Sequence, residues 1–163
     1  MQPVRLAAAV SLAALLGGWS LQENVVARAA TRAGVVTVVQ VDEPPAHVVR
    51  LAGGTRLYRA PTYGVEGAGL AIARVFARTA PDEDLVVLSQ SDGGTECRAE
   101  YVLVAVRRGR PASVSAPFGN CATPAFAREG QRLRITFPRA GDADPEVGVY
   151  AAGRLTRLGQ GGG

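Results

Sequence analysis

The chain has 163 residues, of which 47% are hydrophobic and 20% are charged, and its formal net charge is +4. This length is typical of one domain, and the composition excludes both a disordered chain and a bundle of membrane-spanning helices. All 18 basic residues are arginine, from which no function follows. Only 6% of the chain is aromatic, which argues against a nucleic-acid surface that stacks bases.

The N-terminal segment has the order of a secretory signal peptide. A single positive charge at Arg5 precedes an apolar run from Leu6 to Leu16, and Gly17-Gly18 follows. The run is too short to cross a bilayer, which takes about 20 apolar residues. We therefore expect a periplasmic or secreted protein that meets the membrane only transiently, through this segment.

Two sites carry small residues at the positions that signal peptidase reads. Ala27-Arg28-Ala29 is favoured, with the cut before Ala30, and Thr31-Arg32-Ala33 competes with it. The stretch from Gly17 to either cut is longer than usual, so an uncleaved anchor or a misplaced start codon stays open. The expected organisation is a signal peptide over 1–29, a single β-rich domain over 30–158 and a disordered glycine-rich tail over 159–163.

The chain has two cysteines, Cys97 and Cys121, with 23 residues between them. In an exported protein this pair predicts a structural disulfide, which stabilises a loop of that size by roughly 3–4 kcal/mol. The alternatives are free or redox-active thiols, a metal site or a nucleophile. The only histidine, His47, has no motif linking it to either cysteine, and we expect no metal and no cofactor.

Short apolar or alternating runs between glycine and proline residues predict an antiparallel, all-β or β-rich fold. Residues 69–80 fit either a strand or a helix, and the turn residues that follow favour a strand. We expect a sandwich or a partly open barrel of roughly eight short strands, with at most one helix. The other expected strands are 35–41, 47–51, 55–59, 85–91, 99–106, 113–118, 132–137, 147–151 and 154–158.

Two of these strands, 85–91 and 99–106, are apolar on both faces and are expected at the centre of the sheet. Gly93-Gly94 permits the positive φ of a bulge or tight turn between them, and Gly119-Asn120 is a second turn of this kind. If 99–106 pairs with 113–118, Cys97 and Cys121 lie together at the open end of that hairpin.

The elements that surround the cysteines resemble a known group of proteins. Gly93-Gly94-x-x-Cys97, an apolar strand with Tyr101, and Phe118-Gly119-Asn120-Cys121 are similar to elements of uncharacterised exported bacterial proteins, which are small β-rich domains with GGxxC and FGxC elements. The resemblance covers about residues 85–137. It implies the β-rich fold, supports the disulfide and carries no assigned activity.

No charged or polar cluster forms a recognisable catalytic set. Arg107, Arg108 and Arg110 can contact an acidic partner, as Tyr58 and Tyr63 can contact a protein, but a solvated turn is favoured for the arginines. Solvated turns are also favoured over a calcium site for 141–146 and for the acidic residues of 82–84. A carboxylate pair of Asp92 and Glu96 is the weakest of these hypotheses.

The function expected from these patterns is a non-enzymatic exported binding module of the cell envelope. Its partner would be an envelope or extracellular protein that the sequence does not identify, and not a nucleic acid. The alternative is a hydrolytic enzyme whose acidic residues come together only in the fold.

Overall fold

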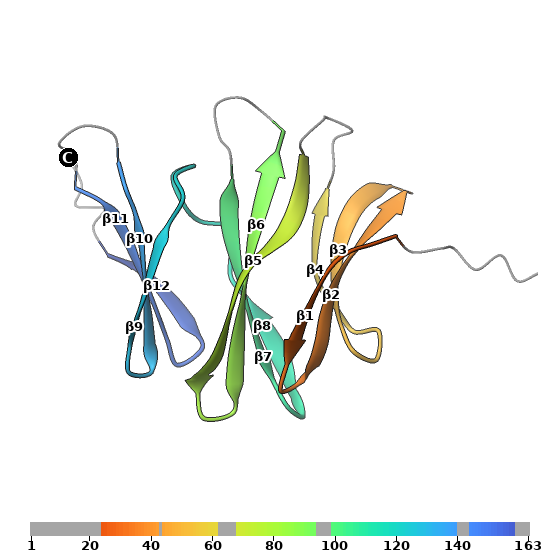
Figure 1. The fold of residues 1–163 in the computed structure, drawn as a ribbon, viewed down its shortest axis with the longest axis horizontal. Coiled ribbons are helices and arrows are strands. Elements are labelled where there is room, and N and C mark those ends of the chain that lie inside the picture. The colour runs from red at the N-terminus through yellow and green to blue at the C-terminus, as the bar shows by residue number, and fades with distance from the viewer. Residues whose placement is uncertain (1–23, 43, 62–67, 94–98, 140–143, 159–163) are drawn as a thin grey trace, which may run out of the picture.

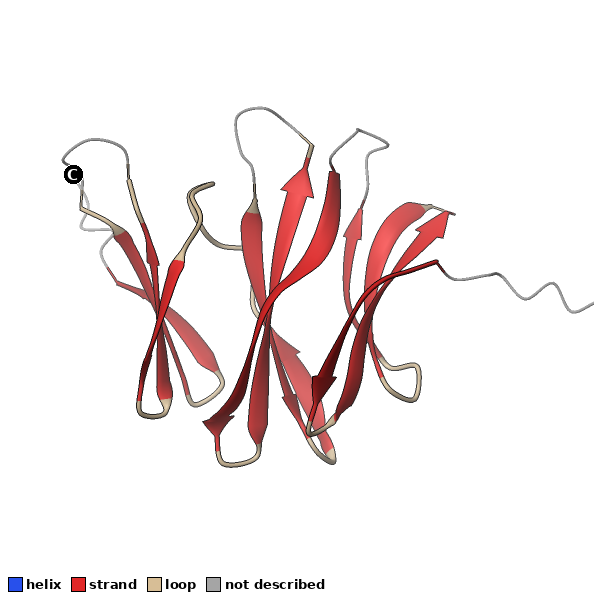
Figure 2. Ribbon diagram, in the orientation of Figure 1, coloured by secondary structure: helices blue, strands red, loops and turns tan. Residues whose placement is uncertain are grey.

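The computed structural model describes residues 24–42, 44–61, 68–93, 99–139 and 144–158. Over these ranges the protein is all-β, with twelve strands and no helix (Figure 2). The strands form three four-stranded antiparallel sheets, and each sheet consists of four strands that follow one another in the chain. The antiparallel all-β expectation is confirmed, whereas roughly eight strands is an underestimate and there are three sheets, not the two of a sandwich.

Each sheet is a meander in which sequence neighbours are hydrogen-bonded neighbours. The first sheet contains β1 (Asn24–Thr31), β2 (Gly34–Asp42), β3 (Pro45–Leu51) and β4 (Arg56–Pro61). The middle sheet contains β5 (Ala68–Ala80), β6 (Glu83–Asp92), β7 (Glu100–Arg107) and β8 (Arg110–Val114). The third sheet contains β9 (Ala125–Glu129), β10 (Arg132–Phe137), β11 (Glu146–Ala151) and β12 (Arg154–Leu158).

The middle sheet is covered on both faces, because it stands between the other two (Figure 1). Successive side chains of a strand point to opposite faces, so β6 and β7 feed two separate hydrophobic clusters. One cluster joins Val86, Leu88, Val102 and Val104 to the first sheet, through Val36, Val38 and Val49. The other joins Leu85, Val87 and Leu103 to the third sheet, through Leu133, Ile135 and Phe137. The continuous apolar runs of β6 and β7 therefore reflect burial on both sides, as expected.

Four strands differ from the expected ones or settle an ambiguity. Residues 69–80 are a strand, β5, as favoured. The structure adds β1, six of whose eight residues lie in the segment expected to be removed with the signal peptide, and β9, which the sequence pattern did not indicate. The expected strand 113–118 lies earlier in the chain, because β8 covers Arg110–Val114. Beyond it, Ser115 N–H donates to the Leu103 carbonyl at 2.9 Å and Phe118 forms an isolated bridge with Tyr101.

Candidate functional site

The acidic run 82–84 was expected to be a solvated turn, and this expectation is wrong for two of its three residues. Asp82 is exposed, and its carboxylate lies 3.8 Å from the guanidinium of Arg110. Glu83 is 0% exposed and Asp84 is 2% exposed. Neighbouring residues of a strand point to opposite faces, so these two buried carboxylates enter two different interfaces of the middle sheet.

Asp84 faces the first sheet and accepts hydrogen bonds from the turn between β1 and β2. Its Oδ2 accepts from the backbone N–H of Arg32 at 2.6 Å, and its Oδ1 accepts from Arg32 Nε at 2.9 Å. The same guanidinium donates to the carbonyls of Pro81 and Glu83, at 2.7 Å each. Arg32 therefore fixes the first sheet to the β5–β6 hairpin with its backbone and its side chain.

The carboxylate of Asp84 also holds an unusual backbone conformation in β5. Arg78 has a φ of 58°, which is uncommon for a residue other than glycine, and its N–H donates to Asp84 Oδ1 at 2.9 Å. Burial alone would raise the pKa of Asp84. The hydrogen bonds from Arg32 and Arg78 and the charge of Arg32 outweigh burial and hold this pKa below its usual value. Asp84 is therefore a structural anion.

Glu83 faces the third sheet. Its Oε1 accepts a hydrogen bond from Thr79 Oγ1 at 3.0 Å, and its Oε2 accepts one from Arg107, the residue directly opposite it on β7. The guanidinium of Arg107 lies against the turn between β11 and β12, where a Cβ on Gly153 would come within 2.8 Å of it. Burial alone would lower the pKa of Arg107, but the hydrogen bond and charge of Glu83 raise it.

The residues expected to contact a partner are engaged inside the protein. Arg107 pairs with buried Glu83, and Arg108 Nη2 donates to the Arg32 carbonyl at 3.3 Å. Tyr58 is half-buried, and its hydroxyl donates to Gln90 Oε1 at 2.6 Å across the interface between the first and middle sheets. Of the described members of this set, Arg108 and Arg110 remain exposed. Tyr63 lies outside the described residues.

The turn before Cys121 matches the expected geometry. Gly119 has a φ of +119°, and a Cβ there would come within 2.9 Å of the Phe137 ring, so only glycine fits. Asn120 accepts from the N–H of Ala122 at 3.3 Å and donates to the Pro138 carbonyl at 3.1 Å. Gly93 also has positive φ, at 80°.

The disulfide itself stays a prediction. Among the described residues the structure has no free cysteine, which leaves Cys121 engaged. Cys97, like Gly94, lies outside the described residues. The bridge between Tyr101 and Phe118 does bring together the two chain segments that carry the cysteines, four residues after Cys97 and three before Cys121.

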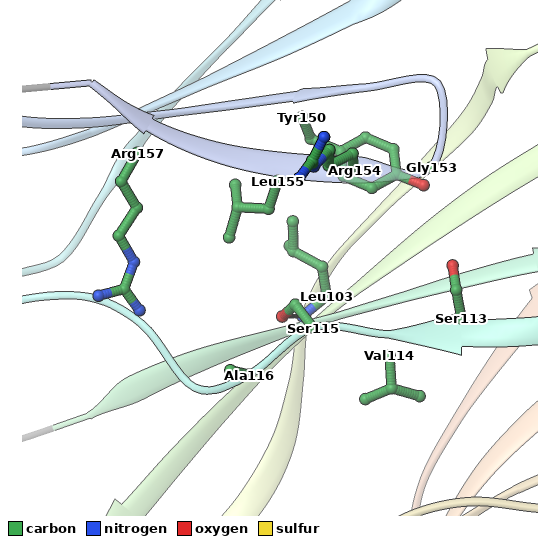
Figure 3. A pocket seen from close by; sticks show the side chains of 10 residues that line it. All are labelled: Leu103, Ser113, Val114, Ser115, Ala116, Tyr150, Gly153, Arg154, Leu155 and Arg157. Atoms are coloured by element: carbon green, nitrogen blue, oxygen red, sulfur yellow. Dashed lines mark hydrogen bonds between the residues drawn. The ribbon is translucent and has the colours of Figure 1, made fainter.

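A cavity of about 250 Å³ opens between the middle and third sheets (Figure 3). Residues 113–116, at the end of β8, form one side, and the β11–β12 hairpin forms the other. Its apolar wall consists of Leu103, Val114, Ala116 and Leu155. Its polar wall consists of Ser113, Ser115, Tyr150, Arg154 and Arg157. The cavity is smaller than a typical drug-sized site and suits a group the size of a side chain.

Tyr150 is the unusual member of this wall. The residue is 3% exposed, and its hydroxyl oxygen has no hydrogen-bond partner among the described residues. Buried polar groups are nearly always paired, so an unpaired one indicates a functional or strained position. Burial raises the pKa of Tyr150 well above its usual value, and the charge and proximity of the Glu83 carboxylate raise it further, whereas Arg107 and Ser113 lower it. The Tyr150 hydroxyl therefore lies near the side chains of Glu83 and Ser113, although it forms no hydrogen bond of normal geometry with either. The hydroxyl therefore stays protonated and can donate a hydrogen bond.

The polar wall of the cavity is rich in donors. Arg157 Nη2 donates to the Pro117 carbonyl at 2.9 Å, and neither Arg154 nor Arg157 forms an ion pair within the described residues. No acidic residue lines the cavity among the described residues, but the buried carboxylate of Glu83 lies behind Tyr150 and is paired with Arg107. Two guanidinium groups, the Tyr150 hydroxyl and the Ser113 hydroxyl suit a group that brings oxygen acceptors, such as a carboxylate.

His47 lies away from this cavity, in the first sheet. It is 7% exposed, its Nδ1 has no hydrogen-bond partner among the described residues, and burial lowers its pKa. A Cβ on Gly69 of β5 would lie 3.7 Å from its Cε1, so the ring packs against the middle sheet. The described residues contain no group of three or more potential metal ligands and no helix long and apolar enough to cross a membrane.

Comparison with known proteins does not assign a role to this cavity. No protein-family model, curated protein or solved structure matches the chain. The sequence did not indicate Tyr150, Arg154 and Arg157 as site residues. The sequence pattern predicted the two strands that carry these residues, 147–151 and 154–158. An alternating pattern does not show which buried hydroxyl lacks a hydrogen-bond partner.

Proposed function

We propose that the protein is an exported, disulfide-stapled β-domain that acts as a non-enzymatic binding module of the cell envelope. The charged start and apolar run of 1–16, the pair of cysteines and the resemblance over about residues 85–137 support export. The turn at Gly119 and the Tyr101–Phe118 bridge support a disulfide between Cys97 and Cys121.

The observation that carries the binding role is the buried hydroxyl of Tyr150 in the wall of the cavity, which forms no hydrogen bond of normal geometry although Glu83 and Ser113 lie near it. A buried donor without a partner costs stability in the free protein and gains a hydrogen bond when an acceptor enters. Arg154 and Arg157 supply positive charge beside it. We infer that the cavity receives a carboxylate-bearing group of a partner protein, held by these donors.

The hydrolytic alternative finds no support in the acidic residues. Glu83 and Asp84 are buried, but they face opposite sides of the middle sheet, and each is bound by an arginine. Asp92 is at the exposed end of β6, and Glu96 lies outside the described residues. Paired carboxylates work in hydrolysis when both face one substrate, which this arrangement prevents for the adjacent pair.

The test uses the Tyr150→Phe variant, which removes only the hydroxyl oxygen. Because that oxygen has no partner in the free protein, the variant should unfold at an unchanged or slightly higher urea concentration. The same variant and Arg154→Ala should lose partners that the native protein captures from an envelope extract. Arg132→Ala, an exposed arginine of β10 outside the cavity, is the matched control.

A peptide titration and the comparison of the variants test whether the cavity is the binding site. A short peptide with a free C-terminal carboxylate should shift the NMR signals of Ser113 and Tyr150, and its C-terminal amide should not. Equal capture by Tyr150→Phe, Arg154→Ala and the control would reject the cavity as the binding site. A clear loss of stability in Tyr150→Phe would instead show that the hydroxyl has a structural role.

A further inference from the structure

Strand β1 is an integral part of the first sheet. Seven of its eight residues pair in an antiparallel ladder with β2, which runs from Asn24 opposite Gln40 to Thr31 opposite Gly34, and Val26 is left without a partner in this ladder at a bulge. Ala27 packs against the cluster between the first and middle sheets. The strand therefore contributes backbone hydrogen bonds and apolar contact together.

The turn that follows β1 fixes the sheet to the rest of the molecule. Arg32 contributes its backbone N–H and its guanidinium to Asp84, and two further donors to the β5–β6 hairpin. Asp84 is 2% exposed, so its charge depends on this arginine. Thr31 Oγ1 donates to the Gly34 carbonyl at 2.6 Å and closes the turn.

Both cleavage sites favoured by the sequence pattern would damage this arrangement. A cut after Ala29 removes six of the eight residues of β1. It leaves β2, with its run of valines, as an open sheet edge, which promotes aggregation. A cut after Ala33 also removes Arg32, and leaves the Asp84 carboxylate buried without its cation.

We propose that processing retains β1, so that the mature protein starts at or before Asn24. Gly18-Trp19-Ser20 has small residues at the two positions that signal peptidase reads, which gives a cut before Leu21. The stretch between Gly17 and this cut has the short length that is usual in signal peptides, whereas the stretch before Ala30 or Gly34 is longer than usual. The inference rests on the proposed export of the protein.

The decisive experiment is N-terminal sequencing and intact-mass measurement of the protein from its native host. We expect the chain to begin at Leu21, and any start from Gly18 to Asn24 supports retention of β1. A start at Ala30 or Gly34 overturns the inference while leaving export intact. A full-length chain overturns both this inference and the proposed export.

Two variants of the full chain check which residues direct the cut. Ser20→Arg places a large charged residue at the proposed cleavage position and should abolish the processed form. Ala29→Val blocks the downstream site with a residue that suits a strand, and should leave the N-terminus unchanged. Processing that survives Ser20→Arg and disappears in Ala29→Val would contradict the assignment.

Discussion

Glu83 and Asp84 are adjacent in β6, and their carboxylates point to opposite interfaces of the middle sheet. Asp84 binds Arg32 of the first sheet, whereas Glu83 binds Arg107, which lies against Gly153 of the third sheet. One dipeptide therefore supplies the buried anion at both interfaces. Three sheets that meet mainly through apolar side chains gain a specific alignment at the end where their hairpin turns gather (Figure 1).

Replacing Asp84 should be far more harmful than replacing its neighbour Asp82. Asp84→Ala leaves Arg32 and the Arg78 N–H without an acceptor, so the free energy of unfolding should fall by about 3–5 kcal/mol. Asp82→Ala is the matched control, because its pair with Arg110 is exposed and such pairs contribute about 0–1 kcal/mol. Urea unfolding of both variants measures the difference, and equal losses would contradict the role given to Asp84.

The stabilising effect of Asp84 should disappear in acid. Its pKa in the folded protein is below its usual value near 3.8, so the unfolded chain takes up the proton first as the pH falls. The contribution is complete above about pH 4 to 5 and is lost as the pH falls through the folded-state pKa. The stability difference between native protein and Asp84→Asn should therefore shrink below pH 4. A difference that stays constant down to pH 2 would argue against a buried ion pair.

His47 should make stability depend on pH in a higher window. Burial lowers its pKa from 6.5, so near that pH the unfolded chain binds a proton that the folded protein does not. The native protein should lose stability as the pH falls below about 6.5, until the folded-state pKa is reached. His47→Gln removes this slope whatever its effect at neutral pH. Identical slopes for the two proteins between pH 5 and 7 would show that His47 titrates normally.

Two glycines in hairpin turns of the third sheet give a matched pair of substitutions. Gly130→Ala, at a φ of +62° with open space around it, should cost about 1 kcal/mol of unfolding free energy from the backbone alone. Gly153→Ala, at +83°, also pushes a Cβ against Arg107, whose guanidinium is held by Glu83. It should cost about 1 kcal/mol more. Equal costs in urea unfolding would mean that Arg107 moves aside freely.

The proposed disulfide should be visible as a change in stability on reduction. Reduction of the native protein should lower the free energy of unfolding by roughly 3–4 kcal/mol, the value expected for closing a loop with 23 residues between the cysteines. Cys121→Ser should be as unstable as the reduced protein and insensitive to reductant. A native protein that is equally stable with and without reductant would contradict the pairing.

Sequence patterns predicted the strands well where burial follows local composition. The apolar runs of β6 and β7 and the alternation of β10 indicated both strand and facing. The pattern failed at β9, where Phe126 and Arg128 share the inward face with few apolar residues to mark it. It also did not indicate β1, since a strand of small residues beside an apolar run looks like a cleavage region.

The site was less predictable, because its chemistry depends on residues far apart in the chain. A Pro-Asp-Glu-Asp run has the composition of an exposed turn, and its burial depends on Arg32, 52 positions before Asp84, and on Arg107, 24 positions after Glu83. The same limit applies to the cavity. Nothing near Tyr150 in the chain shows that its hydroxyl is buried beside residues 113–116 without a partner.

The meander order of the three sheets has a consequence for how the chain folds. Every strand pairs only with its immediate neighbours in the chain, so the contact order within each sheet is low and hairpin closure is local. Only the interfaces between sheets require distant contacts. When the chain emerges N-terminus first during synthesis or export, the first sheet can form early. Arg32 then has no carboxylate partner until Asp84 has emerged. Docking of finished sheets, and not strand pairing, should set the slow step of folding.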